Sequence, residues 1–304
     1  MSGYARHLLS QRRGLAALAG LLLTDRSVRA GGTHVKAPGP VTERTVRPPS
    51  ATLCKDFLRF SGGDPASYRG VLPPHLFPQW SLPVMLEAAR ALPYPATKVI
   101  NAGCGLTVHA ALPLGQELHI TARVSKIDDN GKRALVTIEV VTGTADVPRA
   151  LTADLRLFIP LKRAGTAETV TGSDASKPRQ KPTVPLDVKE LCFQRLGKDA
   201  GLDFAFLTGD FNPIHWLSPY AKAAGFKSVI LHGFGSFARA FDGLVRAALA
   251  GDVQALLALD ADFTRPLPLP AEVGLYVGPE QRVYLGDAPG GAAYLVGHFS
   301  RHSP

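Results

Sequence analysis

The feature that most restricts the fold of this chain is an order of predicted elements that occurs twice. Residues 81–92 (SLPVMLEAARAL) and 232–251 (HGFGSFARAFDGLVRAALAG) carry apolar side chains at spacings of three and four, a pattern typical of amphipathic helices. Ser81 is expected to cap the first helix and Gly251 to end the second. Stretches typical of β-strands follow each helix, at residues 109–127, 132–143 and 149–160 and again at 258–278, 281–287 and 292–301. A long helix followed by antiparallel strands, used twice, predicts a duplicated α+β fold.

The segment between the two halves has the composition of an exposed linker. Residues 160–187 are rich in Lys, Thr, Ser and Pro and poor in large apolar side chains. We therefore predict four parts: a basic N-terminal extension at residues 1–49, a first domain at 50–160, a linker at 161–185 and a second domain at 186–304.

Composition favours a packed globular protein. Apolar residues make up 45% of the chain and charged residues 19%, which is enough apolar material for a core. Most of the net charge of +9 lies in residues 1–50, which hold eight Lys or Arg and two acidic residues. The rest of the chain is only mildly basic and has no nucleic-acid-binding motif, so no nucleic-acid partner is predicted. A mildly positive body would still suit a substrate that carries phosphates.

The apolar stretch Gly14–Leu23 leaves several interpretations open. It is too short to span a bilayer, so no membrane span is expected. With Arg12 and Arg13 before it, the stretch resembles a signal-peptide core or part of an organelle transit peptide. We favour a third interpretation, an amphipathic helix docked on the body. The protein is accordingly predicted to be cytoplasmic, with organelle targeting through the Arg-rich N-terminus as the alternative.

The cysteines predict neither disulfides nor a metal site. Cys54, Cys104 and Cys192 are widely separated and form no CxxC pair and no Cys/His cluster with zinc spacing. They are expected to be buried free thiols in a reducing compartment.

Residues 209–216 (GDFNPIHW) predict a capped turn. Asn212 followed by Pro213 is a helix-start pair, in which Asn caps and Pro occupies the first turn. A second such pair at 218–219 and a glycine at Gly225 predict two short helices joined by a kink.

The same turn places an acid, Asp210, five positions before a base, His215. Held together, a carboxylate and an imidazole can share proton transfers, since histidine titrates near neutral pH. Gly233, in LHGFGS, opens the predicted long helix, and backbone N–H groups at a helix start can stabilise developing negative charge. The spacing alone also fits a purely structural alternative, in which Asp210 only caps the following helix and His215 only bonds a carbonyl.

The flanking residues complete a longer pattern. Residues 204–221 (FAFLTGDFNPIHWLSPYA) resemble the hydratase 2 signature of the MaoC-like dehydratases, the (R)-specific enoyl-thioester hydratases. The matching residues are Phe204, Leu207, Thr208, Gly209, Asp210, Asn212, Pro213, Ile214, His215 and Ala221. Residues 230–238 and 262–273 resemble the elements that follow in that family, the latter with Pro-Ala at 270–271 where the family usually has Pro-Gly.

The resemblance implies a double hot dog fold, with two long central helices, each wrapped by an antiparallel sheet, and the two sheets continuous. Residues 57–70 (FLRFSGGDPASYRG) look like a copy of the active-site segment that keeps Gly63–Asp64–Pro65 but lacks the following His. The first half would then be non-catalytic and supply a wall of an acyl pocket, with residues 71–80 as its candidate lining. His75 and His109 are expected to be structural.

The resemblance also implies an activity: reversible hydration of trans-2-enoyl thioesters of coenzyme A or acyl carrier protein to (R)-3-hydroxyacyl thioesters in fatty-acid metabolism, without a cofactor. Asp210 and His215 would position the water and move the α-proton, and Gly233 would polarise the thioester carbonyl. Asn212 would hold the turn and bond near the site, and Arg265 is a candidate phosphate contact. The alternatives are a non-catalytic acyl-thioester-binding or scaffold subunit and a hot dog thioesterase. Either a monomer or a homodimer of double hot dogs is expected.

Overall fold

The computed structural model of the chain describes residues 3–12, 15–16, 36–95, 98–161 and 181–302. Most of the apolar stretch Gly14–Leu23 and most of the predicted linker lie outside these residues. Across the residues that are described, no helix is long and apolar enough to cross a membrane.

The elements fall into two sets. The first half contains the 3₁₀ helix η1 (Ala5–Gln11), β1 (Thr42–Val46), α2 (Ala51–Ser61), η2 (Pro65–Tyr68), η3 (Pro74–Leu76), α3 (Phe77–Ala89), β2 (Ile100–Val108), β3 (Leu118–Asp129), β4 (Arg133–Gly143) and β5 (Leu151–Pro160). The second half contains β6 (Lys189–Leu196), α4 (Ala200–Thr208), η5 (Pro213–His215), α5 (Ser218–Ala223), β7 (Ile230–Leu231), α6 (Gly233–Ala248), β8 (Leu256–Phe263), β9 (Leu267–Pro268), β10 (Ala271–Val277), η6 (Pro279–Gln281), β11 (Arg282–Gly286) and β12 (Ala293–Arg301).

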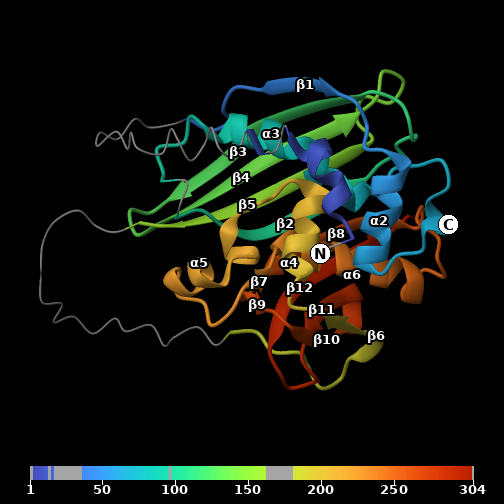
Figure 1. Cartoon of the computed structure of the whole chain (residues 1–304), viewed down its shortest axis with the longest axis vertical. Coiled ribbons are helices and arrows are strands. Elements are labelled where there is room, and N and C mark those ends of the chain that lie inside the picture. Colours follow the sequence, from blue (N-terminus) through green and yellow to red (C-terminus); the bar gives the residue numbers. More distant parts are fainter. Residues whose placement is uncertain (1–2, 13–14, 17–35, 96–97, 162–180, 303–304) are drawn as a thin grey trace, which may run out of the picture.

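Ten of the strands form one antiparallel sheet in the order β1-β3-β4-β5-β2-β8-β12-β11-β10-β6. The first five come from the first half of the chain and the last five from the second, so the half-sheets join where β2 pairs with β8. Figure 1 shows the half-sheets side by side, with the green strands of the first half above the orange and red strands of the second. The predicted α+β class and the continuous sheet are confirmed.

Each half-sheet carries one long helix. Helix α3 packs on β1, β3 and β4, and α6 packs on β2, β6, β8 and β11 (Figure 1). The predicted second helix is confirmed, and Gly251 follows its end in a left-handed conformation with φ 82°. The first helix begins at Phe77, four residues before the expected cap, because the 3₁₀ helix η3 leads directly into α3 and Pro78 takes its first turn. The prediction that Ser81 caps this helix is wrong, since its hydroxyl donates to the Phe77 carbonyl inside the helix.

The duplication extends to the segments that precede the long helices. Helices α2 and α4 both end at a glycine in the left-handed conformation, Gly62 (φ 85°) and Gly209 (φ 86°). A 3₁₀ helix with proline at its first position follows each of them. Further along, the residue Val71 pairs with Pro113 in the first half, as β7 pairs with β9 in the second. Two copies of one unit therefore share their backbone course through this region.

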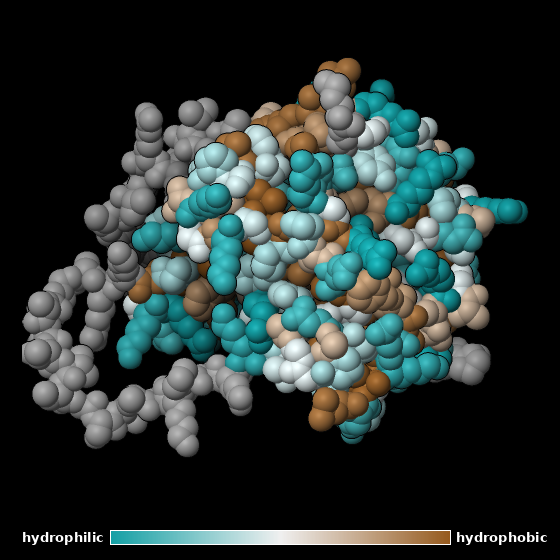
Figure 2. Space-filling model, turned by 60° about the horizontal axis from the view of Figure 1, so that its bottom comes forward, coloured by the Kyte–Doolittle hydropathy of each residue, from teal (hydrophilic) through white to brown (hydrophobic). Residues whose placement is uncertain are grey.

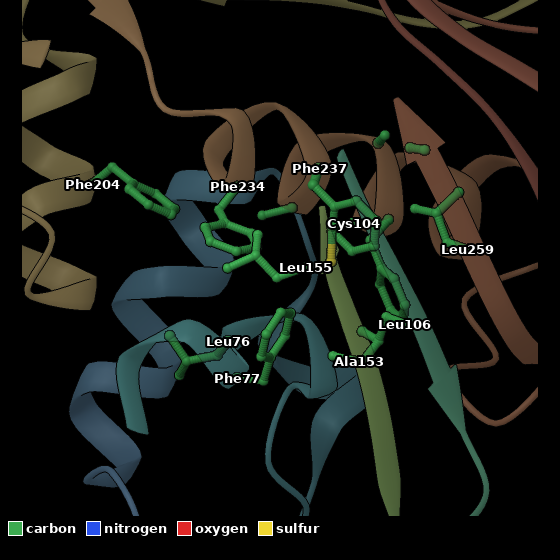
Figure 3. Packing of buried hydrophobic residues seen from close by; sticks show 14 of the residues in the cluster. Leu76, Phe77, Cys104, Leu106, Ala153, Leu155, Phe204, Phe234, Phe237 and Leu259 are labelled. Atoms are coloured by element: carbon green, nitrogen blue, oxygen red, sulfur yellow. The ribbon is translucent and has the colours of Figure 1, made fainter. Parts of the chain in front are cut away.

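One apolar core lies between the sheet and its helices. Phe77 of α3 meets Phe234 of α6 edge-on, with ring centroids 5.5 Å apart, and Figure 3 shows both rings beside the side chains of β2 and β5. Where the two half-sheets join, the outer face of the sheet carries charged side chains: Arg156 pairs with Asp260 at 2.8 Å and with Asp262 at 3.1 Å. Hydrophilic and hydrophobic side chains are interspersed on the surface drawn in Figure 2. All three cysteines are free thiols, as predicted.

Two parts of the predicted N-terminal extension pack on the body. In η1, His7 Nε2 lies 2.7 Å from the buried carboxylate of Asp56, which Arg6 also contacts. The side-chain amide of Gln11 donates to the Phe206 and Leu207 carbonyls of α4. Strand β1, also within residues 1–49, pairs with β3. The domain boundaries themselves stay predictions.

A buried carboxylate on α6 ties the two halves together. Asp242 accepts hydrogen bonds from three side chains of the first half: the Ser61 hydroxyl, the Tyr68 hydroxyl at 2.7 Å, and His75 Nε2 at 2.9 Å. All four side chains are buried. Removing this single acceptor would leave the Tyr68 hydroxyl and His75 Nε2 buried without a partner, whereas Ser61 can still donate to carbonyls of its own helix; such unpaired groups are costly in a protein interior.

We expect Asp242→Ala to lower the free energy of unfolding by about 3 kcal/mol or more. The reason is that buried donors of a charged network lose their acceptor and stay unpaired in the folded state. Urea denaturation measures the change. Asp262→Ala is the matched control, because that carboxylate on the outer face is 71% exposed and should cost less than about 1 kcal/mol. Equal losses in the two variants would contradict the expectation.

Candidate active site

The turn that carries Asp210 and His215 is shaped by local hydrogen bonds. Helix α4 ends at the left-handed Gly209, and the next N–H groups bond to side chains rather than to carbonyls. Asp210 Oδ1 accepts from the N–H of Asn212, and Asn212 Oδ1 accepts from the N–H of Ile214, both at 3.3 Å. The Asn212 cap and the two short helices, η5 and α5, are as predicted.

His215 is buried, and the backbone orients its ring. Nδ1 lies 2.9 Å from the carbonyl oxygen of Ile230 in β7. Because a carbonyl can only accept, Nδ1 carries the hydrogen, and Nε2 of the neutral ring keeps its lone pair. Burial lowers the pKa of His215, while the Asp210 carboxylate and the Ile230 carbonyl oppose this shift. The imidazole is therefore held as a neutral base.

His232 is a third titratable side chain at the site, and sequence reasoning missed it. Its ring lies over the His215 ring, with centroids 3.5 Å apart and 23° between the planes. Its Nε2 lies 2.9 Å from the backbone carbonyl of Asp210. Burial, and then the neighbouring His215, hold the pKa of His232 well below its ordinary value. The one signal in the sequence was its position directly before Gly233.

Gly233 begins α6 at the same site. The first N–H groups of a helix have no carbonyl one turn earlier to bond, so they are available to a polar or anionic ligand. A side chain does not fit here, because a Cβ at this position would lie 2.4 Å from Cδ2 of Phe263. The glycine thus lets the backbone of the helix start reach the cavity directly.

Asp210, Asn212, His215, His232 and Gly233 line one cavity of about 1020 Å³. The opposite wall is apolar and comes from the first half, with Leu82, Met85, Leu86 and Ala89 of α3 and Ile138, Leu155 and Leu157 of the sheet. The expectation that residues 71–80 line this cavity is wrong, since Leu72, Leu76, Phe77 and Trp80 pack in the core instead. The later part of helix α3, from Leu82 to Ala89, forms the wall.

The remaining predicted residues lie as follows. Arg265 lines the cavity between β8 and β9, and its Nη2 donates to the Pro182 carbonyl at 2.6 Å. His75 and His109 lie away from the cavity and bond Asp242 and Thr152 Oγ1 respectively. The structure therefore brings all five predicted site residues, including Arg265, to one cavity.

Asp210, His215 and His232 are also a set that could ligate a metal ion, since their ligand atoms lie within 4.8 Å of one another. One ring nitrogen of each histidine already faces a backbone carbonyl, as described above. These hydrogen bonds fix the orientation of both rings. The separation of 4.8 Å or less is also one that a single water molecule can bridge.

Comparison with known proteins agrees with this geometry. Residues 172–281 match the MaoC-like domain family. The chain is 29% identical over 168 residues to an enoyl-CoA hydratase of Mycobacterium tuberculosis, a match that covers 55% of this chain and only 56% of the hydratase. It is 25% identical over 254 residues to 3-hydroxyacyl-thioester dehydratase X of the same organism, covering 78% of this chain and 84% of the dehydratase. A solved M. tuberculosis protein described as a double hot dog superposes with a TM-score of 0.56 at 14% identity, covering 88% of this chain and 96% of that one.

A ten-stranded sheet that carries two long helices, with this structural neighbour, defines a double hot dog protein. In its second half, the chain is similar to the MaoC-like domain, the family whose signature the motif around Asp210 and His215 resembles.

We expect His215 and His232 both to titrate below the ordinary histidine value of about 6.5. Because the folded-state pKa values are lowered, the unfolded chain takes up these protons at a higher pH than the folded chain does. Stability should therefore decrease as the pH falls below that value. An NMR titration of the imidazole protons measures both pKa values, and either one at or above the ordinary value would contradict the expectation.

Proposed function

We propose that this chain catalyses the reversible hydration of trans-2-enoyl thioesters to (R)-3-hydroxyacyl thioesters. The observation that carries the proposal is the convergence of Asp210, His215 and the helix start at Gly233 on one wall of a large, mostly apolar cavity. The names of the similar hydratase and dehydratase from M. tuberculosis support the same reaction class.

In the hydration direction, the oxygen of a water molecule forms a bond to the β-carbon of the enoyl thioester. The proton that the water loses passes to the Asp210–His215 pair, and the pair delivers a proton to the α-carbon. The carbon–carbon double bond becomes a single bond, and no net proton is gained or lost. Dehydration follows the same path in reverse. The neutral His215 ring and the Asp210 carboxylate suit this exchange, because a ligand atom of each lies within 4.8 Å of the other, a separation that one water can bridge.

Negative charge develops on the thioester oxygen when the water attacks. The N–H of Gly233 stabilises it, since this group has no intrahelical partner and lies at the positive end of α6. A Cβ at position 233 would lie too close to the Phe263 ring. Because glycine has no Cβ, the thioester carbonyl can approach the backbone closely. Asn212 contributes by holding the turn on which the acid–base pair stands.

The first half of the chain serves substrate binding. Its copy of the active-site turn has Asp64, but this aspartate is exposed and caps η2 through the N–H of Ala66. No histidine follows it at the matching spacing. The apolar wall formed by α3 accommodates the acyl chain, and Arg265, on the other side of the cavity, is placed to meet the phosphates of coenzyme A or of a carrier-protein arm.

Asp210→Asn and His215→Ala should each lower kcat for hydration of crotonyl-CoA or a longer enoyl-CoA by about 100-fold or more, since each removes a group that moves a proton. Loss of the enoyl absorbance measures the rate, and chiral analysis of the product tests the (R) configuration. Asp64→Asn is the matched control in the first half and should keep the wild-type rate.

Near wild-type rates in Asp210→Asn or His215→Ala would refute the assignment of those residues. Acyl-CoA binding without turnover at any chain length would instead indicate a binding or scaffold subunit. Release of free thiol, detected with DTNB, would indicate a thioesterase.

Ala89→Trp should lower kcat/KM for long-chain enoyl-CoA by at least about ten-fold and leave crotonyl-CoA within about two-fold, because the new ring fills space along the apolar wall that only a long chain uses. Crotonyl-CoA is the internal control, since a damaged catalytic turn would affect both substrates. Parallel losses on both substrates would contradict the placement of the acyl chain along α3.

A further inference from the structure

His232 touches both members of the acid–base pair from a different element. Asp210 stands after α4, His215 lies in η5, and His232 is the residue directly before α6. Its Nε2 lies 2.9 Å from the Asp210 carbonyl, and its ring covers the His215 ring at 3.5 Å. Behind it stands Phe204 of α4, with ring centroids 4.7 Å apart. The His232 ring therefore lies between the His215 imidazole and helix α4, which precedes Asp210.

The hydrogen bonds define one protonation form. The Asp210 carbonyl only accepts, so Nε2 of His232 carries the hydrogen and Nδ1 keeps the lone pair in the neutral ring. That Nδ1 is buried and has no hydrogen-bond partner in the described part of the chain. Protonating it would bury an unpaired N–H and place a positive charge against His215. His232 is therefore unsuited to exchange protons during turnover.

We propose that His232 is a positioning residue, which fixes Asp210 through its main chain and holds the His215 imidazole in plane by stacking. The effect of His232 on turnover rests on the proposed function, whereas its effect on the His215 ring does not. Because His232 is directly joined to Gly233, it also sets the acid–base pair at a fixed distance from the helix start that meets the thioester oxygen.

Two substitutions separate the two contacts. His232→Phe keeps a ring for stacking but removes the Nε2–H donor, and His232→Asn removes the ring as well, since its amide nitrogen ends near the position of Nδ1, short of Nε2. Each should lower kcat by about ten- to a hundred-fold with KM little changed, as small displacements of catalytic groups do. In His232→Asn, the smaller side chain also lets water reach His215. The acid limb of the pH–rate profile should then move up toward the ordinary histidine range, because burial is the main cause of the low pKa of His215.

The charged and titratable groups that share the cavity with His215 are Arg90, Tyr94, Asp210, His232, Arg265 and Tyr294. Apart from His232, none of these groups is altered in the two variants. A shift in the acid limb of the pH–rate profile can therefore be attributed to removal of the His232 ring.

The matched control is His75→Asn in the first half. His75 is also buried, also stacks on an aromatic ring at 23° (Phe241, centroids 4.5 Å apart), and also has an unpartnered Nδ1. It lies outside the catalytic cavity. This variant should lose stability while keeping the wild-type kcat per folded molecule and the wild-type pH profile.

An NMR titration of His215 in wild type and in His232→Asn keeps the test independent of the activity. An upward shift of the His215 pKa in the variant supports the proposal even if the wild type hydrates no enoyl thioester, in which case only the proposed function fails. An unchanged His215 titration, or wild-type kcat in both His232 variants of an active enzyme, overturns it.

Discussion

The pairing of β2 with β8 is the contact on which the rest of this structure depends. It joins two half-sheets into one, with Gly103 opposite Asp262 and Thr107 opposite Ala258 at its ends. On the inner face, Cys104, Leu106, Leu259 and Ala261 are buried (Figure 3). On the outer face, Arg156 spans the seam to reach the carboxylates of β8. Because the sheet is continuous, α3 and α6 lie next to each other, and a cavity can form with one wall from each half.

That shared cavity explains how two copies of one unit can take different roles. Both copies keep the helix that ends at a left-handed glycine and the proline-led 3₁₀ helix after it. In the first copy, the aspartate is exposed and only caps a turn. In the second, a buried histidine faces the cavity, held by a carbonyl of β7. The first copy contributes apolar surface to the cavity, and the hydrogen bonds to Asp242 link it to α6.

Several strands and cavity residues could not be predicted from sequence patterns. Strand β2 (INAGCGLTV) is rich in small residues and shows no clear alternation, yet it forms the seam between the halves, where the Arg156 side chain and the β8 backbone approach Gly103 closely. Strand β6 (KELCFQRL) is largely polar because it lies at the edge of the sheet. The lining of the cavity was placed too early in the chain, since residues 71–80 and the later part of α3 are both apolar and only packing separates core from cavity wall.

Local sequence is sufficient to specify the turn that carries Asp210 and His215. Gly209, Asn212 and Pro213 act over a few residues, through a left-handed glycine, a side-chain cap and a fixed proline φ, so their effect can be read without the rest of the fold. The tertiary structure alone decided what surrounds the turn. His232 follows Asp210 at a distance of 22 residues, and α3 is further still from it along the chain. Such contacts depend on how β7, α6 and the two half-sheets pack, because burial and stacking are set by long-range neighbours and not by local conformational preference.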